Sequence, residues 1–136
     1  MKNKVERHLK SHKKHGKPVL FLLIDSENFK TSKDVEKMAK GIMKACKKMT
    51  AAPAILVGGS SATDQIEMNN VVKIIKKITR LDTILFPGNI TGVVPKADAI
   101  LFSSLMNSEN PYYITQAQAL GAPLVRKFNL EALPTA

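Results

Sequence analysis

The sequence is poor in several residue types that mark particular functions. It has a single cysteine, Cys46, so a disulfide within the chain and a Cys-x-x-Cys site are both excluded. It has no tryptophan, two tyrosines and five phenylalanines, and no motif that stacks bases or reads a groove, which argues against nucleic-acid binding. It also has no P-loop, no Gly-x-Gly-x-x-Gly motif and no hydrolase elbow.

Long apolar segments are missing as well. The longest apolar run covers residues 19–24, whereas about 20 residues are needed to cross a bilayer, so we expect no transmembrane helix. The basic N-terminus lacks the apolar stretch of a secretory signal. Together with the single cysteine, these absences favour a cytoplasmic protein.

The chain is long enough for one domain with a core of its own. Its 136 residues are 44% hydrophobic, which is ordinary for a globular protein. This length is well below the roughly 250 residues of a typical (β/α)₈ barrel. Cys46 falls in a helical pattern of apolar residues, so we expect its small side chain to be buried.

Positive charge is concentrated near the N-terminus. The formal net charge is +10, and 14 of the 21 Lys and Arg residues lie within residues 1–50. Three interpretations stay open: a solvated lysine-rich surface, attraction to anionic lipid headgroups or a diphosphate substrate, and nucleic-acid binding. His8, His12 and His15 have a helical spacing that can hold a metal ion, but lysines surround them, and we interpret them as part of a solvated basic arm.

Apolar periodicity predicts alternating strands and helices. We expect helices at residues 4–14, 64–80 and 112–120, and another that runs from an N-cap at Ser32 to Met49. We expect strands at residues 19–24, 54–57, 83–87 and 97–102. A short loop or helical turn should occupy residues 90–96, and a new element should begin at Pro123. Strands this apolar, separated by amphipathic helices, call for a parallel sheet covered on both faces. We therefore predict an α/β fold with about four βα units, divided into a basic arm at residues 1–17 and one domain at residues 18–136.

Polar turns follow these strands. Asp25 follows the first strand, a Gly-Gly-Ser turn begins at Gly58 after the second, and Gly88-Asn89 and Asn107-Ser108 follow the next two. In a barrel enzyme, ligand-binding residues occupy the carboxyl ends of parallel strands. The pattern thus predicts a ligand site at this end of the sheet.

Several strings in the same region resemble the motifs of one enzyme family. They are FPGN at 86–89, ADAILF at 97–102, SLMNS at 104–108, NPYYI at 110–114 and AQALGAP at 117–123. The family is geranylgeranylglyceryl phosphate synthase, which makes the first ether bond of archaeal membrane lipids and has bacterial relatives that use a longer prenyl chain. The resemblance begins near Val19 and implies the N-terminal half of a TIM (β/α)₈ barrel, with FNLEALPTA at 128–136 similar to the segment before the fifth strand.

The resemblance also implies a magnesium site. Asp25 matches the family's Mg²⁺-binding aspartate, Glu27 its second acidic position, and Ser60 the hydroxyl that joins the Mg²⁺ shell. Mg²⁺ prefers one or two carboxylates together with substrate oxygens, which suits a diphosphate leaving group. Gly58 and Gly59 permit positive φ and close approach of the backbone to a phosphate. Without the resemblance, an N-cap or turn carboxylate is the favoured interpretation of Asp25, and a plain turn is that of the glycines.

The polar residues further along the chain have two interpretations each. Asn89, Asn107 and Ser108 either line the substrate groove or cap strands and helices. Phe86, Tyr112 and Tyr113 either form an apolar channel for a prenyl tail or belong to the core. The sequence assigns no catalytic residue.

The implied reaction transfers the geranylgeranyl group of geranylgeranyl diphosphate to the 3-hydroxyl of sn-glycerol 1-phosphate, with Mg²⁺ as cofactor. The family's glycerol-phosphate-binding segments have no counterpart in this sequence, so we expect a truncated or split form. A half barrel exposes apolar surface, which implies a homo-oligomer or a complementary C-terminal half-barrel chain, with peripheral contact to an anionic membrane. The alternative is a non-catalytic basic half-barrel that binds anionic lipid or nucleic acid. The prenyl chain length stays undetermined.

Overall fold

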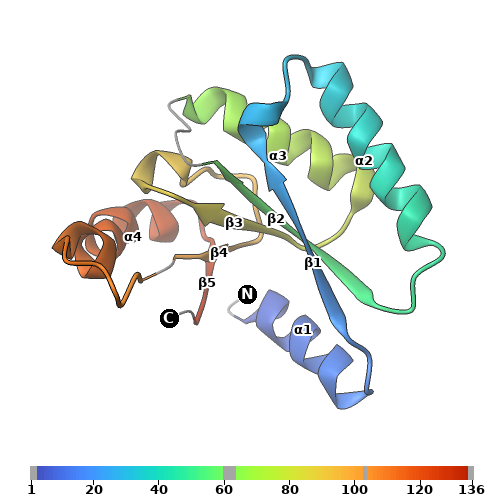
Figure 1. Ribbon diagram of the computed structural model, residues 1–136, viewed down its shortest axis with the longest axis horizontal. Coiled ribbons are helices and arrows are strands. Elements are labelled where there is room, and N and C mark those ends of the chain that lie inside the picture. Colours follow the sequence, from blue (N-terminus) through green and yellow to red (C-terminus); the bar gives the residue numbers. More distant parts are fainter. Residues whose placement is uncertain (1–2, 60–63, 103, 135–136) are drawn as a thin grey trace.

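The protein folds around a single parallel sheet. The structure, a computed structural model, describes residues 3–59, 64–102 and 104–134. The sheet has the order β1-β2-β3-β4-β5, and every neighbouring pair is parallel (Figure 1). The strands are β1 (Val19–Asp25), β2 (Ala52–Gly59), β3 (Thr83–Pro87), β4 (Ala99–Leu101) and β5 (Glu131–Leu133). Because strands that follow one another in sequence are also neighbours in space, the sheet has the winding of a barrel rather than of a doubly wound fold.

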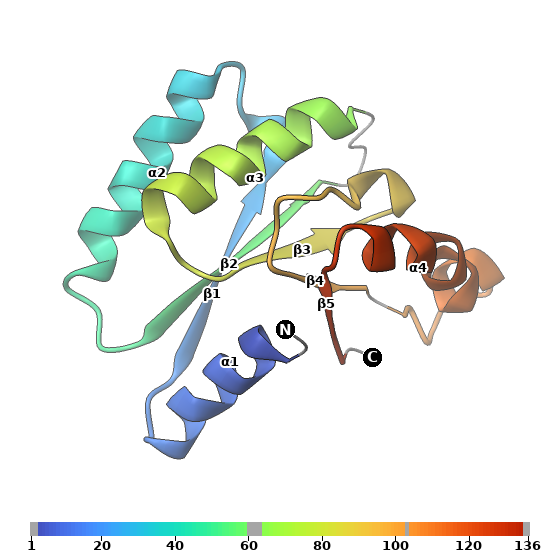
Figure 2. The ribbon, with the colours of Figure 1, turned by 180° about the vertical axis from the view of Figure 1, so that it is seen from behind.

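Helices connect the strands and cover both faces of the sheet. The helices are α1 (Lys4–Lys14), α2 (Ser32–Cys46), α3 (Gln65–Thr79), α4 (Ala117–Lys127), the short 3₁₀ helices η1 (Ser26–Asn28) and η2 (Ile90–Gly92), and the π-helix η3 (Tyr112–Gln116). The views from front and back show α2, α3 and α4 on the outer, convex side and α1 on the inner side (Figures 1 and 2). The inner side is the one that faces the axis of a closed barrel.

Alternating strand residues build two cores. Ile55, Val57 and Leu85 point outward and pack with helix residues such as Val35 and Val71. The residues of the inner core lie at the intervening strand positions and in α1; they are Val5, Ala54, Ile84, Ala99 and Leu133. This alternation is the two-residue period of a strand, applied to a sheet that is apolar on both faces.

Helix α1 is attached to the amino ends of the strands. The Glu131 carboxylate at the start of β5 accepts the backbone N–H groups of Val5 and Glu6, at 2.8 Å each. Val5 is only 1% exposed in the inner core. In the middle of the helix, Nδ1 of His8 bonds to the carboxylate of Asp82, the residue before β3. The basic arm is therefore packed on the sheet through three contacts.

Most predicted elements are confirmed, with boundaries shifted by a few residues. The helix at residues 4–14 and the strand at 83–87 have the expected limits. The N-cap of α2 is Thr31 instead of Ser32, because Thr31 and Asp34 exchange hydrogen bonds in a capping box. Cys46, expected to be buried, is half-buried at the end of that helix.

The C-terminal region differs more from expectation. Pro123 does not begin a new element but lies inside α4, which runs from Ala117 to Lys127. Strand β5 forms within residues 128–136, the segment expected to precede the fifth strand, and pairs with β4. The described residues thus form five strands of the barrel, whereas the sequence predicted four.

Candidate active site

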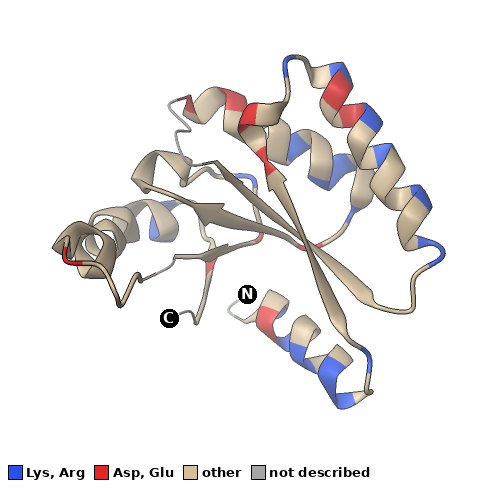
Figure 3. Cartoon of the chain, viewed as in Figure 1, with Lys and Arg blue, Asp and Glu red and all other residues tan. Residues whose placement is uncertain are grey.

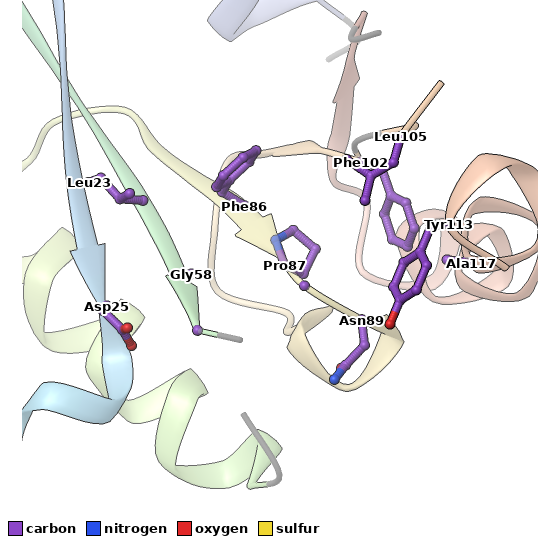
Figure 4. Close-up of a pocket in the computed structure, with 12 residues that line it drawn as sticks. Leu23, Asp25, Gly58, Phe86, Pro87, Asn89, Phe102, Leu105, Tyr113 and Ala117 are labelled. Carbon is purple, nitrogen blue, oxygen red and sulfur yellow. The ribbon is translucent and has the colours of Figure 1, made fainter. Parts of the chain in front are cut away.

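A pocket of about 340 Å³ opens at the carboxyl ends of the strands. Its walls come from β1, β2 and β3, the β3–η2 turn, the segment after β4, and the helices η3 and α4 (Figure 4). The lining residues are Leu23, Asp25, Gly58, Gly59, Phe86, Pro87, Gly88, Asn89, Phe102, Leu105, Tyr113 and Ala117. One end of the pocket thus carries a carboxylate, and the rest is largely apolar.

The strand register places Asp25 at the polar end. Asp25 pairs with Gly58 across β1 and β2, and Gly58 pairs with Phe86 across β2 and β3. Leu23 and Asp25 are two residues apart and therefore share the inner face of β1. The Oδ1 atom of Asp25 accepts the Glu27 N–H at 3.0 Å and caps η1. The turn thereby holds a half-buried carboxylate at the pocket edge.

Gly58 is needed for close packing of two strands. A Cβ atom at this position would lie 2.5 Å from the carbonyl oxygen of Phe86, a distance that no side chain tolerates. Neither Gly58 nor Gly59 adopts the positive φ that glycine permits. The pocket floor at Gly58 is therefore bare backbone, which leaves room above it for a ligand.

Asn89 both caps a helix and lines the pocket. Its Oδ1 atom accepts the backbone N–H of Thr91 at 2.9 Å and also the Thr91 hydroxyl, so it fixes the start of η2. The two interpretations of Asn89 are thus compatible. The side-chain oxygen makes the cap hydrogen bonds, and Asn89 is at the same time one of the residues that line the pocket.

The apolar wall depends on the unusual start of α4. The π-helix η3 precedes α4, and together they bring Tyr113 and Ala117 to the pocket. π-Helical turns are rare and often occur at functional sites. A Cβ at Gly121 would lie 2.8 Å from the ring of Phe102, so the absence of a side chain at Gly121 lets this ring lie directly against α4. Tyr112 packs edge-on to Tyr113, with ring centroids 5.2 Å apart, and does not line the pocket.

The structure separates the predicted site residues into two groups. Asp25, Gly58, Gly59 and Asn89 meet in the pocket. The others do not line it or cannot be placed: Glu27 and Asn107 are exposed, Ser108 caps a turn by accepting the Asn110 N–H at 3.1 Å, and Ser60 lies outside the described residues. Leu105 is the residue of this segment that lines the pocket, and Asn107 and Ser108 follow it in the turn that leads to η3.

Some pocket residues were not recognised from sequence. Leu23, Phe102 and Ala117 are apolar residues of strand and helix patterns, which look like ordinary core positions. Only Leu23 could have been inferred, because it is two residues from Asp25 and residues two apart on a strand share a face.

Metal-binding groups are sparse in the described part of the chain. No group of three or more His, Cys, Asp and Glu side chains converges there, and Asp25 is the one carboxylate that lines the pocket. A single carboxylate fits Mg²⁺ that is completed by diphosphate oxygens and water. Separately, none of the helices among the described residues is both long enough and apolar enough to span a membrane.

Known proteins match this chain closely. A profile of the PcrB family matches residues 13–136. The chain is 64% identical to geranylgeranylglyceryl phosphate synthase of Nitrosopumilus maritimus and 61% identical to that of Cenarchaeum symbiosum, over 98% and 97% of this chain and 51% of each relative.

A solved structure matches the fold. (S)-3-O-geranylgeranylglyceryl phosphate synthase from Thermoplasma acidophilum, in complex with sn-glycerol-1-phosphate, has a TM-score of 0.80 and 30% identity over 98% of this chain and 51% of that one. The parallel sheet is therefore that of about half a TIM barrel, as predicted. The chain spans about half the length of the relatives it matches. On the profile match and these identities, the chain belongs to the PcrB family, the family of the geranylgeranylglyceryl phosphate synthases that it resembles.

Proposed function

We propose that this chain supplies the prenyl diphosphate side of a geranylgeranylglyceryl phosphate synthase. The observation that carries the proposal is the polarity of the pocket, with Asp25 at one end and an apolar wall of Phe86, Phe102 and Tyr113. Geranylgeranyl diphosphate has the same polarity, a charged head and a long apolar tail. Relatives at 61–64% identity carry the name of this enzyme.

In the proposed reaction, the 3-hydroxyl oxygen of sn-glycerol 1-phosphate attacks C1 of geranylgeranyl diphosphate. The new C–O ether bond forms as the bond from C1 to diphosphate breaks, and the hydroxyl proton leaves to solvent or to a base that this chain does not identify. The protein contributes by holding the prenyl tail against the apolar wall, which orients C1 and excludes water.

Asp25 is the residue proposed to hold Mg²⁺. Mg²⁺ held at this carboxylate would supply positive charge to a diphosphate leaving group. Glu27 and Ser60 stay proposals as further contacts, since Glu27 is exposed and Ser60 lies outside the described residues. Bare backbone at Gly58 and Gly59 gives the diphosphate room beside Asp25.

The rest of the enzyme is proposed to pack on the inner face of the sheet. The large apolar residues Phe21, Leu23 and Phe86 are 44%, 63% and 40% exposed there. The relatives are about twice as long, so a complementary half-barrel or a second copy of this chain is the proposed partner, with the glycerol phosphate bound largely by that partner. We place this assembly in the cytoplasm of an archaeal cell, near an anionic membrane.

A reconstitution experiment tests the proposal. The chain would be incubated with geranylgeranyl diphosphate, sn-glycerol 1-phosphate and Mg²⁺, with and without the complementary half of the Nitrosopumilus maritimus relative, and the ether product followed by mass spectrometry. Product only in the complemented reaction is the expected result. No product in either reaction, from halves shown to associate, would reject the assignment.

Asp25 provides the residue-specific test. We expect Asp25→Asn to lower turnover of the complemented enzyme at least a hundredfold, since the neutral amide is a poor Mg²⁺ ligand. Glu109→Gln, at an exposed site away from the pocket, is the matched control and should leave turnover unchanged. Full turnover by the Asp25 variant would remove the role assigned to this carboxylate.

The charge distribution supports a second candidate, a non-catalytic module that binds an anionic surface. Basic side chains gather along α1 and α2, and the formal net charge is +10 (Figure 3). Binding to vesicles that contain anionic lipid, and to duplex DNA, would be measured over a salt series. Phosphate-driven binding must weaken steeply as salt increases. Absence of binding to either at low salt would eliminate this candidate.

A further inference from the structure

Two histidines of α1 converge on one another at the amino end of the sheet. His8 and His12 are four residues apart, one helical turn, and their Nε2 atoms lie 3.0 Å apart. The ring centroids are separated by 4.6 Å and the rings are tilted by 60°. The two outer ring nitrogens therefore lie within hydrogen-bond distance of one another, although four of the eleven residues of α1 are lysines.

A carboxylate fixes the protonation of one of these rings. Nδ1 of His8 bonds to the Asp82 carboxylate, whose side chain is only 15% exposed. An ionised carboxylate only accepts hydrogen bonds, so Nδ1 of His8 donates to Asp82, and Nε2 of His8 accepts the hydrogen bond from Nε2 of His12, which a bound metal ion would replace. Histidines that bind metals typically donate their other ring N–H to a carboxylate in this way, which fixes the tautomer and orients the ring.

We propose that His8 and His12, supported by Asp82, form a binding site for a divalent transition-metal ion such as Zn²⁺. Imidazole nitrogen is a preferred ligand of Zn²⁺, Cu²⁺ and Ni²⁺. Two nitrogens at ~2.05 Å from a tetrahedral Zn²⁺ lie about 3.3 Å apart, so the observed 3.0 Å needs to open only slightly. His12 then carries its proton on Nδ1, and water completes the coordination, because no third protein ligand converges in the described residues.

The site is independent of the proposed catalytic function. Asp82 precedes β3 at the amino end of the sheet, whereas Asp25 and the pocket lie at the carboxyl end. Helix α1 is held at its N-terminus by Glu131 and in its middle by Asp82. An ion bound by His8 and His12 rigidifies this second attachment and thereby fastens α1 to the start of β3.

Some charged residues near the two histidines oppose the binding of a cation, and others favour it. Lys4 and Arg7 on α1 oppose a bound cation, and Lys10 is paired with Glu6 at 2.6 Å. The half-buried Asp82 carboxylate behind His8 offsets part of this positive field. The site should therefore favour ions that bond covalently to nitrogen over Mg²⁺ or Ca²⁺, which prefer oxygen ligands.

Titration of the tag-free full chain with Zn²⁺ by isothermal calorimetry tests the site. We expect one ion per chain for the unchanged protein, and at least a tenfold loss of affinity for His12→Gln, which keeps the His8–Asp82 bond intact. Asp82→Asn should weaken binding about 10–100-fold without removing a ligand. His15→Gln is the matched control, because Nδ1 of His15 bonds to the Ser11 carbonyl and the ring takes no part in the pair.

Two further readouts separate a real site from adventitious binding. Co²⁺ would be added and its visible absorption recorded, since low-coordinate nitrogen ligation gives a spectrum distinct from hydrated Co²⁺. Circular dichroism without metal would confirm that each variant is folded. Equal losses for His12→Gln and His15→Gln, or no Zn²⁺ binding by the unchanged chain, would overturn the proposal.

Discussion

Gly58 shows how a single residue determines the spacing of two central strands. Its missing Cβ allows the carbonyl of Phe86 to approach the backbone of β2. The clash would be between the new Cβ atom, whose position the backbone fixes, and a main-chain oxygen, so it cannot be relieved by a rotamer change. The sequence motif Gly-Gly suggests phosphate binding, whereas the geometry first assigns Gly58 to strand packing.

We predict that Gly58→Ala destabilises the protein by about 1–3 kcal/mol, the range typical of overpacking. The free energy of unfolding would be obtained from urea denaturation. Gly41→Ala is the control, because Gly41 is in α2 with no atom within 4 Å of its Cβ position. There alanine should stabilise the helix by about 0.5–1 kcal/mol. A Gly58 variant as stable as the unchanged protein would contradict the packing role.

Which site residues are visible in the sequence also depends on residue type. Asp25 and Asn89 stand out because each is a polar residue that follows an apolar strand, although the same position also suits a cap, which both residues form. Leu23 and Phe102 do not, because an apolar residue in a strand is equally consistent with a core. The contact between His8 and Asp82 could not be predicted for a different reason: Asp82 is 74 residues away in sequence, and only the fold brings it to α1.

At the scale of elements, the start of α2 is set by Thr31. Its backbone N–H donates to Asp34 Oδ2 at 3.0 Å, while its hydroxyl oxygen accepts the Asp34 N–H at 3.3 Å. Serine is on average a slightly better N-cap than threonine, and the chain offers both residues in succession. Thr31 is the N-cap because only Thr31 has an acidic residue three positions later, so that the two residues can exchange hydrogen bonds.

We therefore predict that Thr31→Ala lowers the free energy of unfolding by about 1 kcal/mol, the usual cost of losing an N-cap. The adjacent Ser32→Ala change should alter it by less than about 0.5 kcal/mol, because Ser32 is an exposed first-turn residue. Thermal or urea unfolding of the two variants in parallel measures the difference. A larger effect at Ser32 would show that Ser32, and not Thr31, acts as the N-cap.

Long periodic segments were predictable, and irregular ones were not. Helices α1 and α3 and strand β3 have strong apolar periodicity and came out within a residue or two. Helix α4 contains Pro123, which normally ends a helix because it lacks an N–H and clashes with the preceding turn. Strand β5 has three residues and is recognisable only from its pairing with β4.

Glu131 links the last strand to the first helix, and its removal should release α1. We expect Glu131→Ala to cost about 1–3 kcal/mol, since two N–H groups at a helix N-terminus lose a charged acceptor. Hydrogen exchange measured by mass spectrometry should show faster exchange across α1 and unchanged protection in α3. Glu109→Ala, at an exposed turn, serves as the reference. Uniform loss of protection would indicate general destabilisation instead of a local release.

At the scale of the whole molecule, the sheet presents an incompletely covered apolar face. Phe21 on β1 is 44% exposed, does not line the pocket, and lies at a sheet edge. Contiguous apolar surface beside an unpaired strand edge promotes association. Analytical ultracentrifugation of the chain alone should therefore show species larger than a monomer.

Phe21→Lys should shift this distribution toward the monomer at equal protein concentration. Ile66→Lys is the control, because Ile66 is 74% exposed on α3, away from the inner face, and should leave the distribution unchanged. Equal effects of the two substitutions would mean that total surface hydrophobicity, and not the inner face, drives association.

The attachment of α1 to Glu131 has a consequence for the order of events during synthesis. The bonded groups are 125 and 126 residues apart, so α1 emerges from the ribosome long before its acceptor exists. At a translation rate of ~5–20 residues per second, this interval is about 6–25 s. During this interval Val5 can contact Ala54 and Ile84 once β2 and β3 exist, but the inner core still lacks Leu133 and the helix N-terminus still lacks its carboxylate acceptor. The N-terminus of α1 can therefore dock fully only after Glu131, at the start of β5, has been synthesised.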